Sequence, residues 1–102
     1  MNHENACPHC ERQKIRTEEE RTALINRLSR IEGQIRGIRG MVEKNAYCTD
    51  ILTQAAAATA ALNSFSRMLL SEHIRTCVKE EVRQGHDEAI EELLTMLQKL
   101  MR

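Results

Sequence analysis

Aromatic residues are nearly absent from this chain of 102 residues, which has one Tyr, one Phe and no Trp. Aromatic side chains supply much of the bulk of a small core. A chain of this length has room for one domain, and with so little bulk it cannot easily build an independent core. We therefore expect burial to continue across a subunit interface.

An excess of one charge is also absent, because 15 Lys and Arg balance 15 Asp and Glu. This balance argues against a uniformly basic nucleic-acid binder. The charge is unevenly distributed, however: residues 21–39 contain five Arg and one Glu, whereas residues 80–92 contain six acids and one Arg. We expect a basic face and an acidic face on the same protein.

No apolar run approaches transmembrane length, and no leader-like apolar segment opens the printed sequence. We expect a cytoplasmic protein. Its four Cys should then be reduced thiols, which favours metal or redox chemistry over structural disulfides.

Gly and Pro are missing from residues 48–77, a stretch dominated by Ala and Leu. The composition predicts one uninterrupted helix, which should run on to about Gln84 and stop at Gly85. Cys48, His73 and Cys77 share one face of this helix, but its rise of about 1.5 Å per residue places the two sulfur atoms about 43 Å apart. A second copy packed antiparallel, with close approach at the Ala-rich centre, would bring Cys48 of one chain beside His73 and Cys77 of the other.

Two further helices are predicted on either side of this one. Thr17 and Glu20 fit a capping box that begins the first helix, and Asp87 is placed to cap the third. Apolar residues of the first helix recur every three or four positions, which predicts one buried stripe: Leu24, Leu28, Ile31, Ile35, Ile38 and Val42. The fold class is thus all-α, a three-helix protomer with a long central helix, in an antiparallel helical-bundle homodimer.

Residues 1–16 are polar, and we expect a mobile N-terminal arm before a domain at 17–102. The arm carries Cys7 and Cys10 in a Cys-x-x-Cys pattern. One such pair is half of a zinc site. An accessory metal site or relay and a pair of exposed thiols are equally good interpretations.

Cys48, His73 and Cys77 combine two thiolates with one imidazole. Soft sulfur donors at a low coordination number suit Cu(I), whereas Zn(II) prefers a fourth ligand. Each Cys taken alone is more often a small buried residue, and His73 alone an interface histidine. Three donors converging under one symmetry operation favour a metal site.

At these residues the sequence resembles the copper-sensing operon repressor (CsoR) family. The matching stretches cover the chain after the arm: residues 26–38 (NRLSRIEGQIRGI), residues 47–52 (YCTDIL), His73-x-x-x-Cys77 and residues 85–93 (GHDEAIEEL).

The resemblance implies an all-helical dimer that assembles into a tetramer, binds double-stranded operator DNA and releases it when metal binds. It implies Cu(I) ligands at Cys48, His73 and Cys77, with Tyr47 and Glu92 next to them. It also implies DNA contacts at Arg27 and Arg67, to which the basic content of the chain adds Arg30, Arg36 and Arg39. Nickel and cobalt members add a His near the start of the first helix, where this chain has Arg16.

The prediction is therefore a Cu(I)-responsive repressor with no enzymatic activity. A cytosolic metal buffer or carrier would use the same ligands without an operator. A nickel-sensing or thiol-electrophile-sensing repressor of the same family is a second alternative. A thiol-based redox enzyme is the least favoured, because neither pair of Cys lies in a recognisable redox fold.

Overall fold

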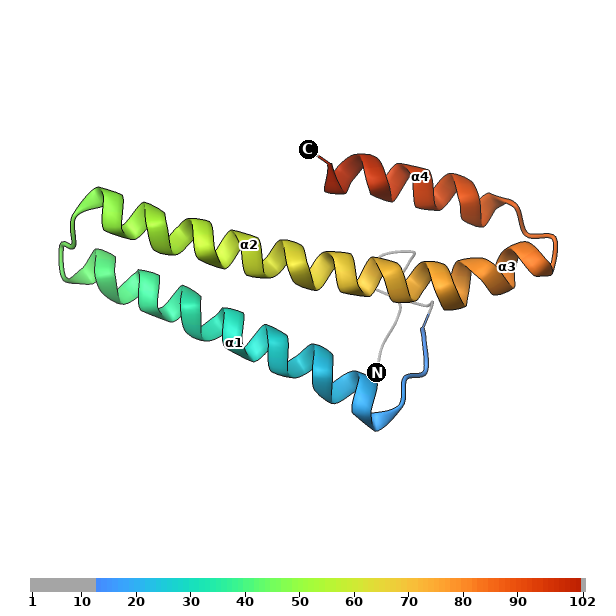
Figure 1. The fold of residues 1–102 in the computed structure, drawn as a ribbon, viewed down its shortest axis with the longest axis horizontal. Helices are drawn as coiled ribbons and strands as arrows, with labels where there is room; N and C mark the ends of the chain where they lie inside the picture. Colours follow the sequence, from blue (N-terminus) through green and yellow to red (C-terminus); the bar gives the residue numbers. More distant parts are fainter. Residues whose placement is uncertain (1–12, 102) are drawn as a thin grey trace, which may run out of the picture.

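The computed structural model describes residues 13–101, and all the regular secondary structure within that range is helical. Helix α1 spans Glu18–Glu43 and α2 spans Cys48–His73. The chain continues through a π-helical segment, η2 (Ile74–Val78), and a short helix, α3 (Lys79–Arg83), before α4 (Glu88–Leu100). Figure 1 shows α1 lying along α2, and α4 folding back along the far end of the rod made by α2, η2 and α3. The predicted all-α class with a long central helix is confirmed.

Helix α1 begins at the predicted capping box. The Glu20 amide donates to the Thr17 hydroxyl (3.1 Å), and the Thr17 amide donates to the Glu20 carboxylate (2.9 Å). Two residues with positive φ then reverse the chain, Asn45 (58°) after α1 and Gly85 (84°) after α3. Asp87 precedes α4 as predicted, but its side chain makes no capping hydrogen bond.

The rod formed by α2, η2 and α3 follows the path predicted for one helix, but it is not regular throughout. In η2 the backbone widens, so that the Lys79 amide donates to the carbonyl of Ile74, five residues earlier. The Thr76 hydroxyl donates to the Glu72 carbonyl (2.8 Å), the group that the amide of residue 76 would use in a regular α-helix. Thr53 and Thr95 make the same bond within regular α-helix, so this bond alone does not explain the wider turn. The rod is therefore uninterrupted, as predicted, but its geometry is π-helical rather than α-helical over residues 74–78.

The buried core of the described protomer is small. Only Ile31, Ala58 and Val78 are buried among residues 13–101. The predicted stripe of α1 is largely open, since Ile35 and Val42 expose 56% and 57% of their surface. Leu52 and Leu62 of α2 are exposed as well. The stripe was predicted to be buried, and within one protomer only Ile31 is, because α2 alone is too narrow to cover it.

No helix among the described residues is long and apolar enough to cross a membrane.

Replacing Gly85 tests the turn that directs α4 back along the rod. An L side chain is strained at φ 84°, so Gly85→Ala should lower the free energy of unfolding by about 1 kcal/mol. Gly33→Ala is the control, because Gly33 is helical and a Cβ there meets nothing within 4 Å in the protomer. Urea unfolding at equal protomer concentration compares the two variants. Unchanged stability of Gly85→Ala would contradict this turn geometry.

Candidate metal site and nucleic-acid interface

The first predicted ligand, Cys48, is the first residue of α2. Its thiol is free and its residue exposed. Tyr47 occupies the cap position before it, makes no side-chain capping bond and exposes 74% of its surface. This end of the rod therefore presents a thiol and a phenol to the outside of the protomer.

The other two predicted ligands lie in the second half of the rod, His73 directly before the π-helical segment and Cys77 within it. His73 ends α2 and is half-buried, and the free thiol of Cys77 is also half-buried. The next residue, Val78, is one of the few buried side chains. Because η2 contacts α3 and α4, a movement of His73 or Cys77 would be transmitted to both helices.

A cluster of charges that sequence reasoning missed lies against the same turn. Lys14 donates to the Glu72 carboxylate (2.8 Å) and to the Thr76 hydroxyl (2.7 Å), and Arg16 Nε lies 3.4 Å from the same carboxylate. The Thr76 hydroxyl is in turn 3.6 Å from Cys77 Sγ. We call residues 13–16 the strap. Lys14 and Arg16 are two positions apart, the period of one side of an extended segment, but nothing in the sequence pairs them with Glu72.

The strap alters the electrostatics of Glu72. Its pKa is lowered from the ordinary value, chiefly because Lys14 donates a hydrogen bond to the carboxylate. The positive charges of Lys14 and Arg16 act in the same direction, and desolvation opposes them. Arg16 Nε is buried and has no hydrogen-bond partner among the described residues, so its contact with Glu72 is an ion pair only.

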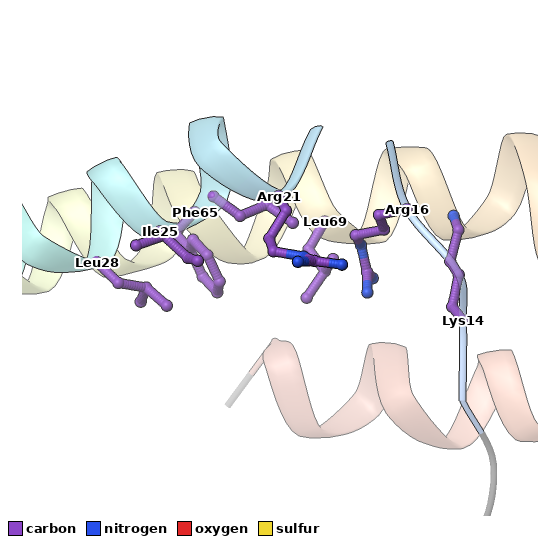
Figure 2. Close-up of a pocket in the computed structure, with 8 residues that line it drawn as sticks. Lys14, Arg16, Arg21, Ile25, Leu28, Phe65 and Leu69 are labelled. Atoms are coloured by element: carbon purple, nitrogen blue, oxygen red, sulfur yellow. The ribbon is translucent and has the colours of Figure 1, made fainter. Parts of the chain in front are cut away.

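Figure 2 shows the strap at one end of a shallow groove. Lys14 extends towards the rod, the Arg21 guanidinium lies beside Phe65 and Leu69, and the Arg16 guanidinium lies between Leu69 and Lys14 in this view. The groove has a volume of about 280 Å³ and an apolar lining from α1 and α2 that also includes Leu24, Ile25 and Leu28.

The three predicted ligands do not converge within one chain. Cys48 and Cys77 begin and end a stretch of rod about 43 Å long. Over residues 13–101, no three side chains of His, Cys, Asp or Glu are gathered closely enough to hold a metal ion. Glu92 lies in α4, and Cys7 and Cys10 lie outside the described residues. Any site built from Cys48, His73 and Cys77 therefore requires two protomers.

The predicted DNA-binding arginines fall into separate groups. Arg27 Nη1 donates to Ser64 Oγ (3.3 Å), which places it one turn from Arg67 on α2. Arg30 lies one turn after Arg27, but Arg36 and Arg39 lie about 180° and 120° away around α1. Arg39 also forms an ion pair with Glu43 (3.7 Å). The Arg27–Ser64 bond thus places Arg27 near the part of α2 that carries Arg67, and helix geometry puts Arg36 and Arg39 on other sides of α1.

Comparison with known families identifies the class of protein. A model of the family described as metal-sensitive transcriptional repressor matches residues 20–99. The chain belongs to this family of metal-sensitive repressors, as the resemblance to CsoR proteins predicted.

Individual relatives agree with this assignment. The chain is 42% identical over 88 residues to the copper-sensing transcriptional repressor CsoR of Bacillus subtilis, covering 85% of this chain and 87% of the relative. It is 51% identical over 59 residues to the copper-sensing transcriptional repressor RicR of Mycobacterium tuberculosis, covering 58% and 62%. These relatives are transcriptional repressors rather than enzymes.

Two solved structures share the fold. The copper-sensing repressor CsoR with Cu(I) from Geobacillus thermodenitrificans aligns with a TM-score of 0.83 and 41% identity, covering 88% of this chain and 95% of that one. The nickel-responsive transcriptional regulator InrS aligns with a TM-score of 0.69 and 35% identity, covering 85% and 99%.

Proposed function

We propose that this protein is a Cu(I)-responsive transcriptional repressor that binds double-stranded operator DNA and releases it when Cu(I) binds between two protomers. The observation that carries the proposal is the wide separation of the three donors along one rod, with Cys48 at its start and His73 and Cys77 beyond its middle. The similarity to a copper-sensing repressor crystallised with Cu(I) supports the choice of metal.

The donor set fits Cu(I). Cys48 and Cys77 are free thiols that are not fully buried, and His73 lies one turn before Cys77. When bound, Cu(I) supplies a link between the Cys48 thiolate of one protomer and the His73 and Cys77 side chains of the partner, using soft donors at low coordination number.

The dimer that this site requires also accounts for the open apolar faces. Leu52 exposes 65% of its surface, and Leu62 and Ile35 expose about half. Since each is already partly buried, covering the rest of one such side chain stabilises an assembly by about 1 kcal/mol. In an antiparallel homodimer centred on α2, the partner covers the exposed leucines of α2. In a homotetramer, a second dimer would cover more of the apolar surface of α1 and α4.

DNA binding is assigned to Arg27, Arg30 and Arg67, with Arg36 and Arg39 available for further phosphate contacts. Guanidinium groups bind phosphate through paired hydrogen bonds. Because Arg27 is held by Ser64, it links α1 to the α2 face that carries Arg67. A change in the relative position of the two helices would alter this arginine pair.

The π-helical turn is the proposed connection between metal and DNA. His73 uses one ring nitrogen as a ligand and retains the other for a contact with Tyr47 or Glu92. Its neighbours in η2 contact α3 and α4. Fixing His73 and Cys77 against a partner subunit thus biases the position of α4 and the arrangement of protomers. The direction of this coupling, release of DNA on metal binding, is what the resemblance to the family implies.

An alternative inducer, Ni(II), is motivated by the similarity to InrS. The donors on the described chain favour Cu(I), because Ni(II) binds more ligands than two thiolates and one imidazole provide.

Anaerobic titration of the protein–operator complex with Cu(I), Ni(II) or Zn(II) tests the proposal. We expect Cu(I) to release DNA at one ion per protomer, as measured by fluorescence anisotropy. His73→Ala should still bind Cu(I) through two thiolates but should lose most of the release, because alanine cannot transmit the imidazole contact. If Ni(II) releases the DNA and Cu(I) does not, the inducer is nickel rather than copper. Normal release by His73→Ala at full copper occupancy would remove His73 from the coupling.

The arginine assignment is tested by the dependence of DNA affinity on salt. Arg27→Ala and Arg67→Ala should each weaken operator binding and lower the slope of log affinity against log salt by about one per lost phosphate contact. Cu(I) affinity should be unchanged. Arg83→Ala is a matched control, because Arg83 lies at the other end of the rod beside Glu80. If the Arg27→Ala/Arg67→Ala double variant binds DNA with wild-type affinity, this arginine surface is not the DNA-binding site.

A further inference from the structure

The strap places two positive charges beside the turn that carries the metal ligands. Lys14 contacts both Glu72 and Thr76, which are adjacent to His73 and Cys77 respectively. Since the Thr76 hydroxyl is 2.7 Å from Lys14 Nζ and 3.6 Å from Cys77 Sγ, the ammonium is no farther from the sulfur than these two distances combined. Arg16 adds a second positive charge, and both Lys14 and Arg16 pair with the single negative charge of Glu72. The cluster of these three side chains therefore carries a net charge of +1.

The charge of the proposed metal centre depends on the ion. Two thiolates, a neutral imidazole and a monovalent ion sum to a net charge of −1. The same ligands with a divalent ion sum to zero. A nearby positive charge stabilises the first complex and has little effect on the second.

We propose that Lys14, supported by Arg16, Glu72 and Thr76, makes the site selective for a monovalent over a divalent metal ion by compensating this negative charge. The inference rests on the proposed function and adds a specificity-determining role for the strap. Lys14 is not a ligand. It acts on Cys77 through space.

The size of the effect follows from Coulomb's law. Two unit charges about 6 Å apart interact strongly enough in water to change a binding constant about threefold, and about tenfold where the effective dielectric constant is halved. Lys14 and Glu72 expose only 22% and 17% of their side chains, so screening at the cluster is less complete than in water. The ratio of Cu(I) to Zn(II) affinity should therefore fall three- to tenfold when Lys14 loses its charge.

This ratio is the appropriate quantity because both metals bind the same free protein. The protonation of the free thiols cancels, as does any change in the stability of the unbound form. A variant that merely loosens the turn weakens both metals together and leaves the ratio unchanged.

The experiment uses the full chain with Cys7→Ala and Cys10→Ala, so that only the interface site is titrated. In this background we compare Lys14→Arg, Lys14→Met and Lys14→Glu, with Lys99→Met, an exposed residue of α4, as the control for total charge. Cu(I) and Zn(II) affinities are measured anaerobically against chromophoric chelators, at two salt concentrations.

We expect the ratio to stay within twofold of the parent for Lys14→Arg and Lys99→Met. It should fall about three- to tenfold for Lys14→Met and by about the square of that factor for Lys14→Glu, and less at high salt. An unchanged ratio in Lys14→Glu, or equal changes in Lys14→Met and Lys99→Met, would overturn the proposed selectivity. If Cys77→Ala leaves the Cu(I) affinity unchanged in the same background, Cys77 is not a ligand. That result would contradict the proposed metal site rather than its selectivity.

Discussion

The rise of a helix is the constraint on which the rest of this structure depends. A continuous rod from Cys48 to Arg83 cannot bend its ends together, so two sulfur donors about 43 Å apart cannot share one ion within a chain. The rod makes the ligand set incomplete in each protomer. A metal site assembled from these donors must therefore report on how two chains are arranged. A repressor whose operator affinity depends on subunit arrangement can use such a site as a switch.

The same rod explains why the protomer cannot bury its apolar side chains. With α1 on one side and α4 at one end, only Ile31, Ala58 and Val78 are buried in the described chain. Interfaces between protomers would then carry both the stability and the ligands. The π-helical segment η2 serves both purposes. It follows His73, contains Cys77 and the buried Val78, and contacts the strap through Thr76.

Much of this could be predicted from the sequence, since helices are specified by local signals. Three local signals define where the helices begin and end: the Thr17 capping box, the residues that reverse the chain at 45 and 85, and the absence of Gly and Pro from 48–77. The π-helical turn could not be predicted, because residues 74–78 contain no Gly or Pro that would set them apart from a regular α-helix. The pairing of Glu72 with the strap has no periodic signature, because it joins segments far apart in the sequence. Helix spacing puts Arg27 and Arg36 on opposite sides of α1, but the contact of Arg27 with Ser64 on α2 required the structure.

The central claim, a metal site shared between chains, is tested most directly by mixing two defective proteins. Cys48→Ala and Cys77→Ala each remove one thiolate from every site of a homodimer, and neither should bind Cu(I) tightly. In a mixed dimer, one site loses both thiolates and the other keeps Cys48 from one chain with His73 and Cys77 from its partner. Refolding the variants together, with mixed dimers verified by mass spectrometry, should restore one tight Cu(I) site per mixed dimer. Verified mixed dimers without a tight site would contradict the shared site.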